Sequence, residues 1–99
     1  MKIAKSERFN KWYKKLDMTQ KTLVDVRLTR ILVNGYFGTI KKLGNIFELK
    51  FKTGIRVYYG LEGDELILLL NGGSKNTKRE QTSDIALAKK IYKEYKNDK

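Results

Sequence analysis

The sequence predicts a single α+β domain, in which an N-terminal helical hairpin is followed by a small antiparallel sheet and a C-terminal helix. Apolar residues recur at helical spacing near both ends of the chain, whereas between residues 39 and 71 they alternate with polar ones or run continuously. A chain of 99 residues without proline, internal repeats or a Ser/Gly-rich stretch offers no place for a domain boundary. Residues 1–99 are therefore expected to form one domain.

The first part of the chain predicts two helices after a short strand at residues 2–4. Ser6 can cap a helix whose inner stripe consists of Phe9, Trp12, Tyr13 and Leu16. A second helix is expected from residue 19 or 20 to 33, ending at Asn34-Gly35, with its apolar face formed by Val24, Leu28, Ile31 and Leu32. A turn near Asp17-Met18 joins the two helices into a hairpin.

The middle of the chain predicts three strands, at residues 46–51, 55–61 and 65–71, preceded by either a short strand or an irregular segment at residues 39–43. The last of them is apolar on both faces, which is typical of a central strand covered by helices on one side and by loops or a partner on the other. Gly72-Gly73 has two interpretations: a sharp turn after this strand, or bare backbone that lets a phosphate approach Lys75. A helix from about Thr82 to Tyr95 ends the fold.

Pairing rules predict the register of the hairpin at residues 46–61. A three-residue loop, 52–54, with Gly54 in the left-handed conformation keeps charged residues off the apolar face. The apolar face then contains Phe47, Leu49, Phe51, Ile55, Val57 and Tyr59. Glu48, Lys50, Arg56 and Tyr58 share the opposite face, with Lys50 across from Arg56. Two adjacent cations repel unless an anion or Glu48 lies between them.

Composition narrows the classes of function. A net charge of +11 favours a polyanionic partner such as nucleic acid. The surplus is concentrated in Lys41, Lys42, Lys50, Lys52 and Arg56, and again in Lys75, Lys78 and Arg79. The absence of cysteine and histidine argues against disulfides, zinc and thiol or imidazole catalysis, and no cofactor is expected. No apolar run could span a bilayer and no signal peptide is evident, so we expect a cytoplasmic protein without a membrane partner.

The order and spacing of several motifs resemble the RelE/ParE superfamily of toxin–antitoxin toxins, and within it the HigB-like, phage-associated branch. The motifs are Glu48-Leu49-Lys50, Gly54-Ile55-Arg56-Val57-Tyr58-Tyr59, Leu69-Leu70-Asn71-Gly72-Gly73-Ser74-Lys75 and Gln81-Thr82-Ser83-Asp84-Ile85 with Ala88. Upstream, Phe9-x-x-Trp12, Arg27-Leu28-x-Arg30 and Asn34-Gly35-x-x-Gly38 also fit. Lys50 stands where the branch usually has arginine, and Lys78-Arg79-Glu80 resembles an insertion.

The resemblance implies a toxin-like fold and an endoribonuclease that cleaves mRNA, usually on the ribosome. It also implies a cognate antitoxin with a helix-turn-helix domain, through which alone operator DNA would be contacted. On this hypothesis Arg56 and Lys75 clamp the scissile phosphate, and Lys50 and Lys52 hold or activate its neighbour. Glu48 either acts as a base or orients Lys50 and Arg56 by ion pairing. Further RNA contacts are expected from Lys41, Lys42, Tyr58, Lys78 and Arg79.

Two other functions remain open from the sequence. A ParE-like inhibitor of DNA gyrase could share the same fold, because fold does not fix function. A nucleic-acid-binding module without turnover would need the same cationic residues. A cationic cluster on the sheet face favours RNA chemistry over gyrase inhibition.

Overall fold

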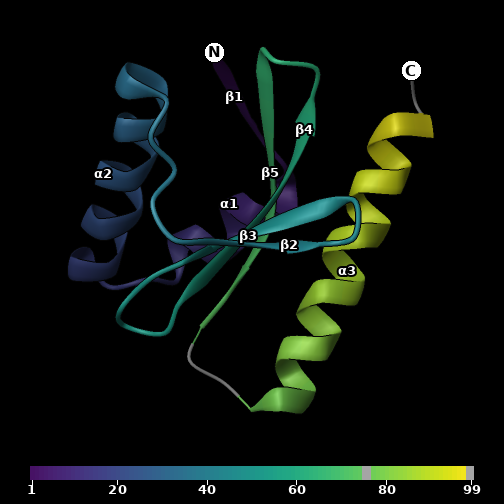
Figure 1. Cartoon of the computed structure of the whole chain (residues 1–99). Coiled ribbons are helices and arrows are strands. Elements are labelled where there is room, and N and C mark those ends of the chain that lie inside the picture. Colours follow the sequence, from purple (N-terminus) through teal and green to yellow (C-terminus); the bar gives the residue numbers. More distant parts are fainter. Residues whose placement is uncertain (75–76, 98–99) are drawn as a thin grey trace.

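The computed structural model describes residues 1–74 and 77–97, which form a five-stranded sheet with helices on both faces (Figure 1). In chain order the elements are β1 (Lys2–Lys5), α1 (Glu7–Lys14), α2 (Met18–Asn34), β2 (Ile40–Leu43), β3 (Ile46–Lys50), β4 (Arg56–Glu62), β5 (Leu66–Gly73) and α3 (Lys78–Asn97). The strand order is β1-β5-β4-β3-β2. The predicted α+β fold is confirmed, although β1 pairs parallel with β5 and so makes the sheet mixed.

The N-terminal helical hairpin forms where the capping residues predict it. The Ser6 hydroxyl accepts a hydrogen bond from the Phe9 N–H at 3.0 Å and so caps α1. The Asp17 carboxylate accepts one from the Gln20 N–H at 2.8 Å, which starts α2 at Met18, slightly before the predicted residue 19 or 20. Gly35, with φ of 67°, ends α2 in the left-handed conformation.

The register predicted for the β3–β4 hairpin is confirmed. Phe47 lies opposite Tyr59, Glu48 opposite Tyr58, Leu49 opposite Val57 and Lys50 opposite Arg56. The connecting loop contains Gly54 with φ of 95°, a conformation that L-residues rarely adopt. The ladder stops before the expected Phe51–Ile55 pair, because β3 ends at Lys50.

Strand β5 differs from the prediction in its length and its regularity. It continues through Gly72 and Gly73, which pair with Val57 and Arg56, so the expected turn at these glycines is wrong. A bulge places Tyr58 opposite Asn71 but Tyr59 opposite Leu69, which leaves Leu70 as the extra residue. The Ser6 hydroxyl donates a hydrogen bond to the carbonyl of Leu70 and ties α1 to the bulge.

Gly72 is explained by packing within the sheet. A Cβ at this position would lie 2.3 Å from Cδ2 of Trp12, so only glycine lets the indole rest on the strand. Gly60 plays the same part beneath Tyr92 of α3, whose ring carbon would lie 2.5 Å from an added Cβ. Close packing against Trp12, which is neither of the two interpretations given to the glycine pair, thus accounts for Gly72 without a ligand.

The two faces of the sheet build two apolar clusters. Between the sheet and α1 and α2 lies a cluster that includes Phe9, Val24, Leu28, Ile31, Leu49, Val57, Tyr59, Ile67 and Leu69. The opposite cluster contains Ile46, Tyr58, Leu68, Leu70, Ala88 and Tyr92. Helix α3 therefore covers the face for which the sequence predicted loops or a partner, and that expectation is wrong (Figure 1).

Helix α3 begins at Lys78, earlier than the predicted start near Thr82. The Thr77 hydroxyl accepts a hydrogen bond from the Glu80 N–H, and the Glu80 carboxylate accepts one from the Thr77 N–H, both at 3.2 Å. This reciprocal capping box supports the additional turn. Across the described ranges, every helix is too short or too polar to cross a lipid bilayer.

Candidate functional site

A row of polar side chains crosses the sheet on the face covered by α3. Lys41 of β2 lies opposite Glu48 of β3, which lies opposite Tyr58 of β4, which in turn lies opposite Asn71 of β5. Residues directly opposite in antiparallel strands point to the same face, so the four side chains share one side of the sheet. Lys41 is exposed, whereas Glu48, Tyr58 and Asn71 are buried.

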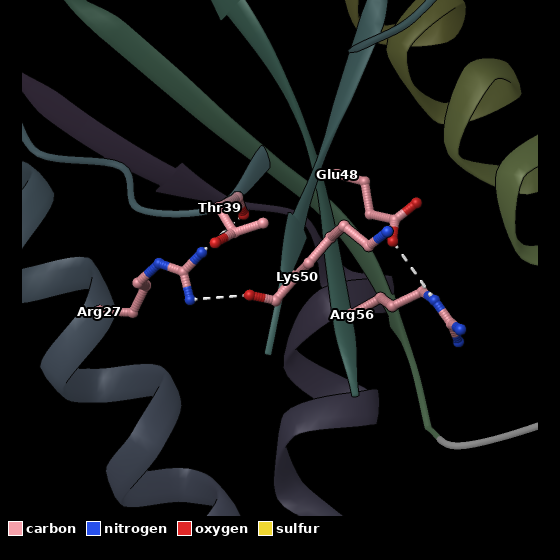
Figure 2. A network of polar contacts seen from close by, with 5 residues as sticks. All are labelled: Arg27, Thr39, Glu48, Lys50 and Arg56. Carbon is pink, nitrogen blue, oxygen red and sulfur yellow. Dashed lines mark hydrogen bonds and ion pairs between the residues drawn. The ribbon is translucent and has the colours of Figure 1, made fainter. Parts of the chain in front are cut away.

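Glu48 is the buried charged residue of this row. Its side chain is 1% exposed, and one carboxylate oxygen lies 3.3 Å from Nε of Arg56, whose side chain is 21% exposed (Figure 2). The approach is an ion pair without hydrogen-bond geometry, and neither carboxylate oxygen has a hydrogen-bond partner in the described protein. The Glu48 carboxylate thus holds the partly exposed Arg56 guanidinium next to the buried polar residues.

Lys50 and Arg56 lie side by side on neighbouring strands, as the register predicts. Figure 2 shows their side chains on the same side of the hairpin as Glu48. The buried carboxylate offsets part of the repulsion between the two cations. An anion that approaches the loop ends of β3 and β4 meets exposed Lys50 and partly exposed Arg56 together, and we call these two residues the cationic pair.

Tyr58 is completely buried, although the sequence predicted that it contacts RNA. Burial, and next the negative charges of Glu48 and Asp84, raise the pKa of its phenol to about 12. The hydroxyl has no hydrogen-bond partner within the described ranges. The expectation that Tyr58 stacks on a base or contacts a phosphate therefore does not hold, because α3 covers the ring.

Asn71 completes the buried cluster and connects it to α3. Its amide nitrogen donates a hydrogen bond to the backbone carbonyl of Asp84 at 3.1 Å, while its side-chain oxygen lacks a hydrogen-bond partner in the described structure. Sequence reasoning placed Asn71 at the end of an apolar strand and within the motif that leads to Lys75, but gave its side chain no role. The bulge at Leu70 turns it beneath α3, and no simple alternation predicts this.

The other basic residues predicted to contact RNA, where the structure describes them, lie on separate parts of the surface and do not form one cluster with Lys50 and Arg56. Lys42 lies opposite Phe47 and so projects from the face opposite to Lys41. Lys52 lies in the loop after β3, next to α2, and lines a groove there. Lys78 and Arg79 are exposed in the first turn of α3. Lys75 lies outside the described residues, so its predicted contact with phosphate stays a prediction.

Arg27 of α2 is an organising residue that sequence reasoning did not assign to the site. It donates hydrogen bonds to the carbonyls of Phe37 at 2.6 Å, Thr39 at 2.8 Å and Lys50 at 3.0 Å. Figure 2 shows Arg27 with Thr39 and Lys50. Burial lowers the pKa of its guanidinium. Gly38, with φ of 74°, makes room for this side chain, since a Cβ there would lie 2.8 Å from Nε. Arg27 thereby fixes the strand end that carries Lys50.

Residues 10–93 match the model of the family described as phage derived protein Gp49-like (DUF891), and the chain belongs to this family. It is 37% identical over 90 residues to an uncharacterized protein of Haemophilus influenzae, covering 87% of each chain. The fold is similar to that of isolated Escherichia coli RelE toxin, with a TM-score of 0.64 and 17% identity over 85% of this chain and 94% of RelE. RelE in the RelB–RelE antitoxin–toxin complex of Methanococcus jannaschii gives a TM-score of 0.65 and 14% identity, over 83% of this chain and 96% of that one.

These similarities confirm the resemblance to the RelE/ParE superfamily at the level of the fold. The Gp49-like family assignment agrees with the phage-associated character predicted from the motifs. Placement in the HigB-like branch stays a prediction. Within the described residues, no three Asp or Glu side chains gather as a metal-binding group.

Proposed function

We propose that this protein is the toxin of a toxin–antitoxin pair and acts as an endoribonuclease on mRNA bound to the ribosome. The observation that carries the proposal is the pair of neighbouring cations, Lys50 and Arg56, on a RelE-like sheet, with Arg56 held by buried Glu48. The family membership and the RelE-like fold support the toxin class.

The cationic pair, Lys50 and Arg56, can stabilise the negative charge that develops during RNA cleavage. When the 2′-hydroxyl attacks the adjacent phosphorus, the bond from phosphorus to the 5′-oxygen breaks, the 2′-proton passes to solvent and the departing 5′-oxygen takes a proton from solvent. Negative charge increases on the phosphate oxygens in the transition state, and donors aimed at these oxygens lower the barrier. Arg56 is the principal phosphate ligand in this proposal, with Lys50 beside it and Lys75 as a further predicted ligand. A carboxylate that holds the guanidinium in place reduces the entropy lost when phosphate binds.

Glu48 is assigned to positioning in this proposal. A general base must reach the proton that it removes, whereas this carboxylate is 1% exposed and directed at Arg56. Tyr58, whose pKa is raised to about 12, stays neutral at physiological pH and is buried. With no histidine in the chain, acceleration then depends on charge stabilisation and on the alignment of mRNA by the ribosome.

The partners follow from the same proposal. The net charge of +11 favours approach to ribosomal RNA, and exposed Lys41, Lys78 and Arg79 would add salt-dependent contacts to the RNA backbone. A cognate antitoxin with a helix-turn-helix domain would restrain the activity and contact operator DNA. The RelB–RelE complexes, described as antitoxin–toxin complexes, support such a partnership.

Mapping of transcript ends after expression in bacteria tests this function. The wild-type chain should generate new mRNA ends and arrest growth, and Arg56→Ala should reduce cleavage about 100-fold, as expected for a lost transition-state contact. Arg8→Ala removes the same charge from an exposed position on α1 and should leave cleavage unchanged. Circular dichroism checks folding. Arg56→Lys keeps a positive charge that can pair with Glu48.

Three results would contradict the proposal. Unchanged transcript ends in Arg56→Ala would remove Arg56 from the site. Intact transcripts with altered DNA supercoiling would indicate a gyrase inhibitor. Salt-dependent RNA binding without any cleavage by the wild type would indicate a binding module.

A further inference from the structure

Helix α2 carries apolar side chains on a second flank, away from the core. Its inner stripe, Val24, Leu28 and Ile31, is buried against the sheet. On another flank, Leu23 and Val26 are 38% and 45% exposed, three residues apart and therefore on one side of the helix. Tyr36, just beyond the helix, is 60% exposed. A surface helix usually needs one apolar face only, so this second flank requires an explanation.

The second flank forms one wall of a groove between α2 and the loop that joins β3 to β4. The groove has a volume of about 580 Å³ and is lined by residues that include Leu23, Val26, Tyr36 and Phe51. The Arg27 guanidinium lies 4.7 Å from the centre of the Phe51 ring. Arg27 also donates hydrogen bonds to the backbone carbonyls of Phe37, Thr39 and Lys50. These bonds hold together the segments that form the base of the groove.

The charge around this groove has a single sign. Arg27, Arg30, Lys50 and Lys52 are among the lining residues, and none of the described lining residues is acidic. Lys50 is at the end of β3: its backbone carbonyl accepts a hydrogen bond from Arg27, while its side chain lies with those of Glu48 and Arg56. The groove is therefore next to the strand end that carries Lys50, on the side of the sheet away from the Lys50 and Arg56 side chains.

We propose that this groove is the docking site of an acidic amphipathic segment of the antitoxin. This inference rests on the proposed function. Apolar side chains of the segment would bury Leu23, Val26 and Tyr36, and its carboxylates would pair with Arg30 and Lys52. A segment seated there lies beside the strand end that carries Lys50.

Charge and surface chemistry favour this occupant over two others. A second copy of the chain would bring a further net charge of +11 against a cationic rim. Single-stranded RNA would pair with the cations, but sugar and phosphate groups bury aliphatic side chains such as Leu23 and Val26 poorly. An acidic protein segment with an apolar face satisfies both features of the groove.

Titration calorimetry with the purified product of the reading frame adjacent to this gene tests the docking site. Val26→Asp should weaken binding at least about tenfold, because it places a charge in the apolar contact. Leu32→Asp is the matched control: Leu32 is 46% exposed on another flank of α2 and lines a different depression. Its affinity should equal that of the wild type. The double variant Arg30→Glu, Lys52→Glu should also weaken binding and reduce its dependence on salt.

The outcomes separate this inference from the proposed function. Equal affinity of Val26→Asp and wild type, or no binding of the wild type, would overturn the docking site whatever the chain does to RNA. If Val26→Asp loses transcript cleavage without any antitoxin, the groove serves RNA and the inference is wrong. A dimer of the free chain that Val26→Asp dissociates would assign the groove to a second copy. Absence of cleavage by the wild type would count against the proposed function alone.

Discussion

The two faces of the sheet differ in what their buried residues can do. Toward α1 and α2, the central strands contribute aliphatic and aromatic side chains to the larger apolar cluster. Toward α3, the same strands bury Glu48 and Asn71 and the phenol of Tyr58, each with polar atoms that lack a hydrogen-bond partner in the described structure. The first face buries apolar side chains, which stabilises the fold. The second face buries these unsatisfied polar atoms, which lowers stability, and its Glu48 carboxylate holds Arg56 in place. This division assigns stability to one face and the proposed chemistry to the other.

The largest effect on stability is expected from the apolar face. Leu49 is 0% exposed, and Leu49→Ala should lower the free energy of unfolding by about 2–5 kcal/mol, through lost transfer energy and a cavity. Denaturant unfolding measures this change. Ile40→Ala is the control, since Ile40 lies opposite Leu49 on β2 but is 42% exposed. A comparable loss in both variants would contradict the account of this face.

Glu48→Gln tests whether Glu48 positions Arg56 on the face covered by α3. Loss of the ion pair should leave Arg56 less well positioned and reduce cleavage about tenfold, with an unchanged dependence on pH. Glu7→Gln, which changes an exposed ion pair with Lys11 on α1, should have no effect on cleavage. Loss of the acidic limb of the pH–rate profile in Glu48→Gln would instead identify Glu48 as the base.

Tyr58→Phe tests the cost of the buried phenol. Because its hydroxyl lacks a partner, its removal should change stability at neutral pH by about 1 kcal/mol or less. The folded-state pKa of about 12 lies above the ordinary value of 10.0, so the phenol's contribution is present below pH 10 and is lost as pH rises toward 12. Unfolding measured over this interval should show a shallower loss of stability in Tyr58→Phe. If the free energy of unfolding falls with pH equally steeply in Tyr58→Phe and wild type, the ionisation of Tyr58 does not cause the loss of stability.

The sequence predicts the hairpin in detail because several local rules agree there. Alternation of polar and apolar residues, the need to keep Lys52 off the core and the left-handed Gly54 all select one register, and β3 and β4 adopt it. That register was sufficient to place Lys50 beside Arg56. Alternation does not indicate which face a distant helix will cover, so the burial of Tyr58 beneath α3 could not be read from the hairpin.

Other differences arise from non-local structure or from a missed signal. The bulge that turns Asn71 toward α3 depends on pairing between β4 and β5 and on the contact of Ser6 with Leu70. Gly72 resembles a turn residue in the sequence, but it is required by Trp12, which is distant in the chain. The early start of α3 could have been predicted, because Thr77 and Glu80 have the spacing of a capping box.

Two adjacent lysines on β2 provide the most direct test that the α3 face is the face where RNA chemistry occurs. Lys41 and Lys42 are both exposed, but Lys41 lies opposite Glu48 and Lys42 lies opposite Phe47, so they project from opposite faces. Cleavage of mRNA on ribosomes should fall about three- to tenfold in Lys41→Ala, with the loss diminishing at high salt, and should be unchanged in Lys42→Ala. Equal losses in the two variants, or a loss in Lys42→Ala alone, would contradict the assignment of chemistry to the α3 face.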